Sequence, residues 1–266
     1  MVVFDRLLSR LLVVAPDRWI VKGGFALDLR LGHRARVTQD LDLARQDTEE
    51  AATADFAAAT EVDLGDFFVF AIERTSVLDA VGEGVAVRYR VQANLDGRRF
   101  EYVRLDIGLG VPLPETPDQL TGPDLLAFAG IAPIEVPALP LEDHVAEKVH
   151  AYTRTRGDGR ENTRVKDLID LMLIPSAAAF EAGRLRQALR ITFETRAIQV
   201  CPDVLPPPPA AWAIPYRKLA TEVALDPDLA TGHRLAAAFL DGVLNGSLAD
   251  AARWDPATGA WSSPGG

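Results

Sequence analysis

The chain has 266 residues, of which 48% are hydrophobic and 25% are charged, a composition that excludes a fully disordered protein. Its 28 Lys and Arg residues face 38 Asp and Glu residues, and the net charge of −10 argues against a protein that coats nucleic acid along its length. No uncharged stretch approaches the roughly 20 residues of a membrane span, and the first residues do not resemble a signal peptide. We therefore expect a cytoplasmic protein with no membrane partner, which the single cysteine, Cys201, also favours.

Helix and strand signals alternate in the first part of the chain. Apolar residues at helical spacing end at Pro16, and an apolar run from Trp19 meets Gly23 and Gly24, as at the end of a buried strand. In chain order, the pattern predicts a helix over 6–14, a strand over 19–22, a helix over 25–31, a strand over 37–43, a helix over 47–59, a strand over 67–72, and a hairpin of strands 85–95 and 99–109 around Asp96-Gly97. This order favours a mixed α/β sheet over a β-sandwich.

The second part of the chain is predicted to be helical. Frequent prolines from 112 to 140 indicate a crossover between two subdomains. Helices are predicted over 141–155, 163–174, 180–193, 215–224 and 229–244. Trp254 and Trp261 are expected to pack together across a tight turn, before a disordered tail at 262–266. We therefore divide the chain into a sheet lobe with an N-terminal helix at 1–135, a helical lobe at 136–252, and a C-terminal turn with a flexible tail at 253–266.

Three carboxylates are candidate metal ligands. Alternation over 37–43 puts Asp40 and Asp42 on one face of a strand, and Asp106 lies late in an apolar strand of the predicted hairpin. Carboxylates on neighbouring strands repel one another unless a cation lies between them, and Mg²⁺ prefers oxygen ligands. One or two Mg²⁺ ions held here could support an in-line displacement at phosphorus.

Two glycines precede these carboxylates. Gly23 and Gly24 have no side chains, so phosphate oxygens could approach the backbone N–H groups at the start of the following helix. The alternative is that the glycines form only a turn and that the aspartates are solvated strand ends. Asp-x-Asp pairs also arise by chance, and the second pair, Asp226 and Asp228, lies at a predicted helix start where N-capping explains it.

A lysine and two aspartates stand out in the helical part. Lys148 emerges from the helix face that is expected to pack inward, where its ammonium needs an anion such as a nucleotide phosphate. The alternative is a surface lysine whose aliphatic stem lies along apolar neighbours. Asp167 and Asp170 lie in a helix that is apolar nearly all round, so each needs a partner. Either could pair with Lys148 or act as a base on an acceptor hydroxyl, and the spacing does not choose between them.

A basic segment joins these two helices. Its cationic residues are Arg154, Arg156, Arg160, Arg164 and Lys166. They form either a strip that binds an RNA backbone beside the metal site or an ordinary solvated loop. The histidines show no metal-binding spacing, so a zinc site is not expected.

These motifs resemble the DNA polymerase β-like nucleotidyltransferase superfamily, and within it the AbiEii/MenT type toxins of bacterial toxin–antitoxin systems. The superfamily motifs are Lys22-Gly-Gly-Phe-Ala-Leu, Thr38-Gln-Asp-Leu-Asp-Leu and Arg104-Leu-Asp. Glu147-Lys148 and the run Arg164-Val-Lys-Asp-Leu-Ile-Asp-Leu are more specific to the toxins, and the resemblance spans about residues 18–261. Many relatives have a hydroxyl residue after the glycine turn where this chain has Phe25, so a hydroxyl contact to phosphate is not expected from this turn.

The resemblance implies a Mg²⁺-dependent nucleotidyltransferase of the α/β (α+β) class, with a nucleotidyltransferase-like mixed sheet lobe and a C-terminal helical lobe. Such an enzyme would transfer a nucleotide from an NTP to an RNA acceptor, with the 3′ end of tRNA as the expected target, and would block translation until a cognate antitoxin neutralises it. The implied roles are metal binding by Asp40, Asp42 and Asp106, nucleotide binding by Lys22, Gly23, Gly24 and Lys148, and completion of the site by Asp167 or Asp170.

Two other functions stay open. An antibiotic nucleotidyltransferase of the aminoglycoside type would modify a hydroxyl of a cationic drug, which the net charge of −10 favours and the basic segment disfavours. A protein that keeps the fold without turnover would act as a binding partner or regulator, and the presence of all three carboxylates argues against it.

Overall fold

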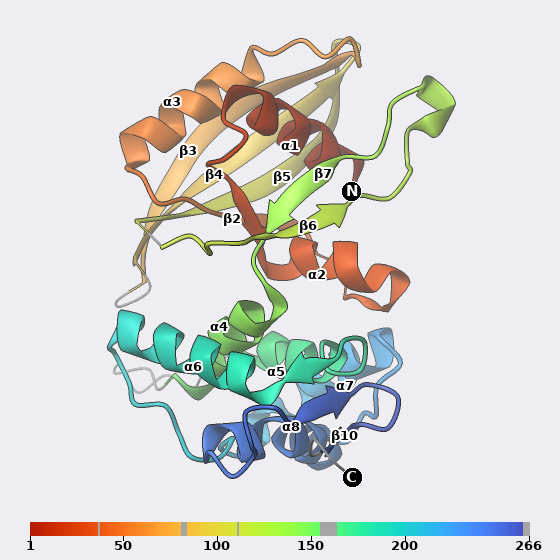
Figure 1. Ribbon diagram of the computed structural model, residues 1–266. Helices are drawn as coiled ribbons and strands as arrows, with labels where there is room; N and C mark the ends of the chain where they lie inside the picture. Colours follow the sequence, from red (N-terminus) through yellow and green to blue (C-terminus); the bar gives the residue numbers. More distant parts are fainter. Residues whose placement is uncertain (37, 81–83, 111, 155–163, 263–266) are drawn as a thin grey trace. The chain divides into compact units, whose positions relative to one another are not determined.

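The computed structural model describes residues 1–36, 38–80, 84–110, 112–154 and 164–262 of the chain. The chain forms two compact units, whose elements are labelled in Figure 1. The first unit comprises 1–32 and 37–140, and the second comprises 33–36 and 141–266. Within the described residues, no helix is both long enough and apolar enough to cross a membrane.

The first unit is built on one mixed sheet. In the part of the chain that the structure describes, its strands lie in the spatial order β3-β4-β5-β2-β1-β7-β6. The strands are β1 (Ile20–Lys22), β2 (Asp40–Ala44), β3 (Phe68–Ala80), β4 (Gly84–Leu95), β5 (Arg98–Leu109), β6 (Asp118–Thr121) and β7 (Glu135–Ala138). β2 is parallel to β5 and β1 is parallel to β7, whereas the other neighbours are antiparallel. The predicted mixed α/β fold class is confirmed.

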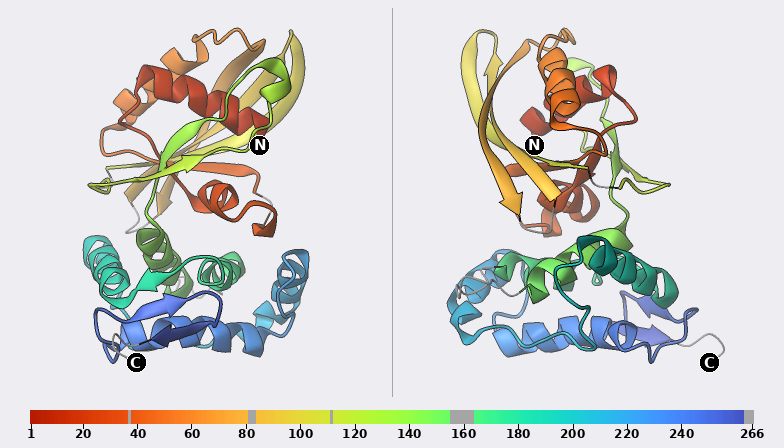
Figure 2. Two further views of the ribbon diagram at one scale, coloured as in Figure 1. Left: turned by 45° about the vertical axis from the view of Figure 1, so that its right-hand side comes forward. Right: turned by 90° about the vertical axis from the view of Figure 1, so that its left-hand side faces the viewer.

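Helices cover one face of the long strands. The helices of this unit are α1 (Val2–Val14), α2 (Gly23–Leu31) and α3 (Glu49–Thr60), with the 3₁₀ turn η2 (Ala127–Ala129). Figure 2 shows α1 and α3 on the same side of β3, β4 and β5. Leu11 and Phe56 from these helices are fully buried in one core with Val91 and Leu105 of the strands. The alternation of apolar and polar residues along β4 and β5 thus divides each strand into a buried face and an outer face.

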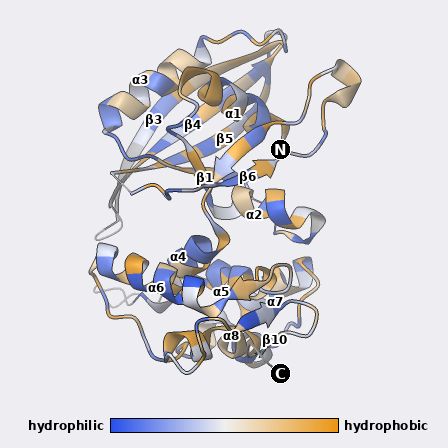
Figure 3. Ribbon diagram, in the orientation of Figure 1, coloured by the Kyte–Doolittle hydropathy of each residue, from blue (hydrophilic) through white to orange (hydrophobic). Residues whose placement is uncertain are grey.

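The proline-rich segment 112–140 does more than connect two subdomains. It supplies β6 and β7, which pair with each other, and β7 joins the sheet beside β1 through Val21 and Ala138. Each of the two strands has only four residues, and Pro137 lies within β7, so no strand signal is visible in the sequence. The loop between them carries exposed Leu125 and Phe128 and appears partly hydrophobic in Figure 3.

The second unit is mainly helical, as predicted. Its helices are α4 (Leu141–Thr153), α5 (Val165–Leu173), α6 (Ala182–Arg196), α7 (Ala213–Glu222) and α8 (Leu229–Leu244), with 3₁₀ turns η1 (Gly32–Arg34) and η3 (Ala210–Trp212). Asp228 accepts a hydrogen bond of 2.8 Å from the backbone N–H of Thr231, which confirms N-capping as its role.

A small antiparallel sheet closes the second unit. Its strands are β8 (Phe180–Glu181), β9 (Arg253–Asp255) and β10 (Ala260–Ser262). Trp254 and Trp261 pack with their ring centroids 5.6 Å apart, as expected for the predicted turn. Ser262, predicted to begin the disordered tail, instead belongs to β10, and residues 263–266 lie outside the described residues.

Candidate functional site in the sheet unit

The strand register brings two of the predicted metal ligands together. Asp42 of β2 lies directly opposite Asp106 of β5, and the two strands are parallel. Paired residues on neighbouring strands point to the same face of a sheet, so both carboxylates are on one face. Asp40 lies two residues before Asp42 and shares this face. The strand register therefore puts the three predicted ligands on one face of the sheet, and their binding of a shared cation stays a prediction.

The start of α2 lies against one of these carboxylates. Gly23 is the first residue of α2 and has a φ of +66°, a conformation that favours glycine. A Cβ atom at Gly23 would overlap the side chain of Asp42. The close approach of Asp42 is therefore a second reason, besides the positive φ, why this position requires glycine. Gly24 is buried behind it, and Lys22 pairs in register with Asp42 across β1 and β2. The N-terminal N–H groups of α2 and the carboxylates thus belong to one site.

Two arginines occupy the same face and were not predicted as site residues. Arg88 donates to Asp106 through Nε and Nη2, both over 2.7 Å, and Arg104 donates from Nε to Oδ1 of Asp40 over 2.5 Å. The hydrogen bonds with Asp106 raise the pKa of Arg88 despite partial burial, and the charges of Asp106, Asp40 and Asp42 act in the same direction. One guanidinium therefore interacts with all three carboxylates.

The chemistry of this site fits a divalent cation, although the present side-chain positions do not form a complete cage. Within the described residues, no group of three or more His, Cys, Asp or Glu side chains is arranged to hold a metal ion. The oxygen ligands of Asp40, Asp42 and Asp106 are those that Mg²⁺ prefers, and their strands place them on one face. The ion pair of Arg88 with Asp106 and its attraction to the charges of Asp40 and Asp42 indicate that a positive charge is favoured here.

A second cluster of predicted residues lies in the helical unit. Lys148 of α4 forms ion pairs with Asp167 over 2.9 Å and with Asp170 over 2.7 Å, both of α5. The side chain of Lys148 is 12% exposed, so it is not the surface lysine of the alternative interpretation. Structural pairing with both aspartates, one of the possibilities left open by the sequence, is what the structure shows.

Arg36 completes this cluster, and sequence reasoning did not identify it. Its Nε and Nη2 donate to the two oxygens of Asp170 over 3.0 and 3.1 Å. Burial would raise the pKa of Asp170, but the charges of Lys148 and Arg36 lower it below the ordinary value. Burial would likewise lower the pKa of Lys148, but Asp167 and Asp170 raise it. Lys148 and Asp170 are therefore both held in their charged forms.

The predicted basic strip is only partly described. Arg156 and Arg160 fall within 155–163, outside the described residues. Arg154 is half-buried, and Arg164 and Lys166 are exposed at the start of α5. These positions do not distinguish RNA binding from a solvated loop.

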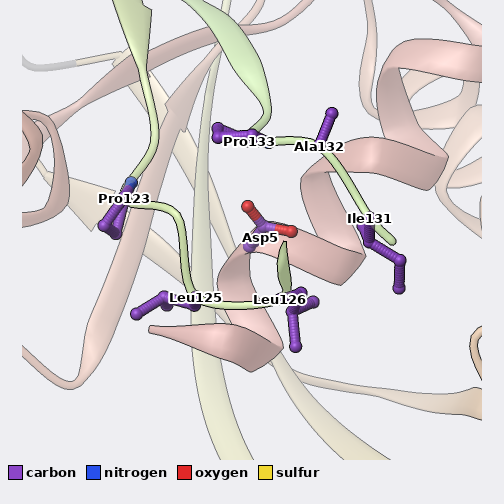
Figure 4. Close-up of a pocket in the computed structure, with 7 residues that line it drawn as sticks. All are labelled: Asp5, Pro123, Leu125, Leu126, Ile131, Ala132 and Pro133. Atoms are coloured by element: carbon purple, nitrogen blue, oxygen red, sulfur yellow. The ribbon is translucent and has the colours of Figure 1, made fainter. Parts of the chain in front are cut away.

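A small pocket lies elsewhere in the sheet unit. It lies between α1 and the loop that joins β6 to β7. Figure 4 shows Asp5 beside Pro123, Leu125 and Leu126 of this loop. None of these residues is a predicted site residue, and Asp5 is already ion-paired with Arg6. The pocket is therefore not the candidate active site.

Comparisons with known proteins bear on the fold and the family of the chain. MenT4, a nucleotidyltransferase toxin from Mycobacterium tuberculosis H37Rv, has a similar structure, with a TM-score of 0.55 at 21% identity over 89% of this chain and 86% of MenT4. JHP933 from Helicobacter pylori aligns with a TM-score of 0.49 at 15% identity over 91% of this chain and 90% of that protein. No curated protein sequence matches the chain. The family model for the nucleotidyl transferase AbiEii toxin of type IV toxin–antitoxin systems matches residues 6–254, and the chain therefore belongs to the AbiEii family of nucleotidyltransferase toxins.

Proposed function

We propose that this chain is a Mg²⁺-dependent toxin that transfers a nucleotide from an NTP to the 3′ end of a tRNA in the cytoplasm and thereby blocks translation. Family membership gives the coarser part of this statement, a nucleotidyltransferase toxin with an NTP substrate and an antitoxin partner. The observation that carries the rest is the position of Asp42, which lies opposite Asp106 in the sheet and against Gly23 of α2. This arrangement supports a site in which the carboxylates bind metal and the start of α2 binds phosphate.

The carboxylates would hold the metal. Asp42 and Asp106 are opposite each other, and Asp40 is the third ligand on the same face. Bound Mg²⁺ would stabilise the charge on the transferred phosphoryl group and the pyrophosphate leaving group. Arg88 and Arg104 neutralise Asp106 and Asp40 before substrate binds, and their guanidinium groups suit phosphate oxygens as well as carboxylates.

The beginning of α2 would bind the triphosphate. The first N–H groups of a helix have no partner within the helix and carry partial positive charge, which attracts phosphate. Gly23, which has no side chain to separate this backbone from Asp42, begins the helix, and Lys22 adds a cation at the N-cap position. Because Phe25 follows the glycines, recognition depends on backbone N–H groups rather than on a hydroxyl side chain.

The helical cluster would contribute a phosphate contact and a base. The ammonium of Lys148 has three N–H donors, and Asp167 and Asp170 account for two of them. The third would donate to a phosphate oxygen. Asp170 is 0% exposed and also paired with Arg36, so we assign it a positioning role. Asp167 forms an ion pair with Lys148 but, among the described residues, none with Arg36, which makes it the better candidate for a base on the acceptor hydroxyl.

A nucleotide-transfer assay that compares the wild type with Asp42→Asn tests the proposal. Purified protein is incubated with each labelled NTP, Mg²⁺ and either total tRNA or an aminoglycoside, and the RNA 3′ ends are sequenced. We expect one NTP to label tRNA, and Asp42→Asn to lower the rate by at least about 100-fold. Asp96→Asn, in the exposed turn between β4 and β5, is the matched control. Undiminished transfer by Asp42→Asn, or labelling of the drug in place of RNA, would overturn the proposal.

A further inference from the structure

The outer face of the antiparallel strands begins at the candidate active site. α1 and α3 cover the other face of β3, β4 and β5, and Figure 2 shows no helix of this unit, among its described residues, over the outer face of these strands. Alternation places Arg88 and Arg90 of β4, and Tyr102, Arg104 and Asp106 of β5, on this outer face. The face therefore continues from the carboxylates along two strands without a break.

Positive charge accumulates immediately beside the carboxylates. Arg90 lies directly opposite Arg104 in the antiparallel pair, and the side chain of Arg104 is 53% exposed. Like charges opposite each other destabilise a sheet unless an anion lies nearby. Asp40 supplies one such anion to Arg104, and Glu73 of β3 lies opposite Arg90. Arg99 adds a third arginine farther along β5.

An exposed tyrosine follows the arginines. Tyr102 is 42% exposed, and the guanidinium carbons of Arg90 and Arg99 lie 4.1 and 5.4 Å from its ring centroid. Its hydroxyl donates to Gln92 over 2.7 Å, and Gln92 donates to Asn94 over 2.8 Å. The ring is thus fixed in orientation by its neighbours, and the side-chain amides beside it can form hydrogen bonds with base edges.

We propose that this strip, defined as Arg90, Gln92, Asn94, Arg99, Tyr102 and Arg104, binds single-stranded RNA and leads its end to the carboxylates. The proposal rests on the proposed function, because it assigns the surface that holds the RNA acceptor. Arginines that neutralise a phosphate backbone, combined with an aromatic platform on which bases stack, are typical of single-strand binding. Four residues of β5 separate Tyr102 from Asp106, about 13 Å at a rise of about 3.3 Å per residue, so only the last few nucleotides would lie along the strip.

A binding experiment on the full chain tests the strip. Fluorescence anisotropy measures the dissociation constant for a labelled single-stranded RNA of about 12 nucleotides, and for the same sequence as a duplex. Tyr102→Ala removes the stacking platform, and Arg90→Gln removes one cation. Arg74→Gln is the matched control, because Arg74 is an exposed arginine of β3 that pairs with Glu49 of α3 on the helix-covered side. Thermal unfolding of each variant checks that the fold is intact.

We expect Tyr102→Ala to weaken single-strand binding by about 5- to 100-fold and Tyr102→Phe, which keeps the ring, to restore most of it. Arg90→Gln should lower the slope of log K against log salt concentration by about 0.7, the value for one phosphate contact on a single strand. The duplex should bind more weakly than the single strand, because its bases are not available for stacking. Arg74→Gln should leave both affinity and salt dependence unchanged.

The same variants in the transfer assay separate this inference from the proposed function. If the wild type labels RNA but Tyr102→Ala and Arg90→Gln match Arg74→Gln in affinity and in KM for RNA, the strip does not bind RNA. The proposed function then stands. If the wild type neither binds nor labels RNA, the RNA-binding strip and the proposed function are both wrong. If the wild type binds single strand and duplex equally and Tyr102→Ala has no effect, the stacking role is wrong.

Discussion

Arg88 of β4 donates two hydrogen bonds, each 2.7 Å long, to the carboxylate of Asp106 on β5. The two residues are also directly opposite in the strand register, so the contact is built into the hairpin. A bidentate guanidinium occupies both oxygens of a carboxylate. Arg88 therefore competes with any cation for this ligand.

Replacing Arg88 should strengthen metal binding. Charge-assisted hydrogen bonds contribute about 1.5–3 kcal/mol, and the 34% exposure of Arg88 reduces this to about 1 kcal/mol, or about 5-fold in affinity. We expect Arg88→Gln to bind Mn²⁺ about 5-fold more tightly than the wild type in a titration followed by electron paramagnetic resonance. Arg74→Gln should behave as wild type. Weaker binding by Arg88→Gln would show that Arg88 supports the metal instead of competing with it.

Substitution of Gly23 should be more harmful than substitution of another glycine with positive φ. Gly23 and Gly97 have φ values of +66° and +72°, but a Cβ at Gly97 would meet no atom within 4 Å, whereas one at Gly23 would overlap Asp42. We expect Gly97→Ala to lower the free energy of unfolding by about 1 kcal/mol and Gly23→Ala to lower it by about 2–4 kcal/mol. Urea unfolding measures both. Equal losses would mean that Asp42 moves aside without cost.

The stability of the helical unit should depend on pH through Asp170. Its pKa is held below the ordinary value of about 3.9, so the stability it contributes is present above about pH 4 and is lost as the pH falls through its lowered pKa. We expect Asp170→Asn to cost about 3 kcal/mol at pH 7, because Lys148 and Arg36 lose a buried partner. Urea unfolding at several pH values should show the difference from wild type shrinking below about pH 4. A difference that is constant with pH would contradict this assignment.

The two tryptophans of the β9–β10 turn should differ in importance. Trp254 is buried and donates to the carbonyl of Pro175 over 2.7 Å, whereas the half-buried Trp261 donates to that of Phe239 over 2.9 Å. Trp254→Phe loses a buried donor and ring volume, which should cost about 2 kcal/mol and lower Tm by about 4–8 °C. Trp261→Phe should have a smaller effect. Calorimetry measures both, and the opposite order would contradict the burial argument.

The predicted faces of the strands agree with the structure because they depend only on local alternation. Asp40 and Asp42 share a face in any strand that contains both. The pairing of β2 with β5, in contrast, is a long-range contact between strands separated by the whole β3–β4 hairpin, and no local pattern encodes it. The convergence of Asp42 and Asp106 was therefore a prediction that only the fold could test.

Arg88 could not be placed from the sequence because of a bulge. The Asp96-Gly97 turn pairs Leu95 with Arg98, and an unbroken hairpin would then put Arg88 opposite Leu105. The register shifts by one residue between Ala93 and Asn94, which moves Arg88 opposite Asp106. A bulge of this kind leaves no clear signal in the sequence, yet it decides which side chain lies opposite Asp106.

The helical cluster was predictable only in part. Apolar neighbours around Lys148, Asp167 and Asp170 correctly indicated that these charges need partners. Arg36 comes from a short segment of the chain that precedes β2, and nothing near it in sequence indicates a carboxylate more than a hundred residues away. Partners supplied across such separations come from tertiary structure alone.

The order of synthesis gives the register of β2 and β5 a further consequence. A ribosome makes Gly23, Asp40 and Asp42 well before it reaches Asp106. β5, which carries Asp106, therefore pairs with β2 only afterwards. A polypeptide released before that point lacks the carboxylate of Asp106, and with it one of the three that share this face of the sheet.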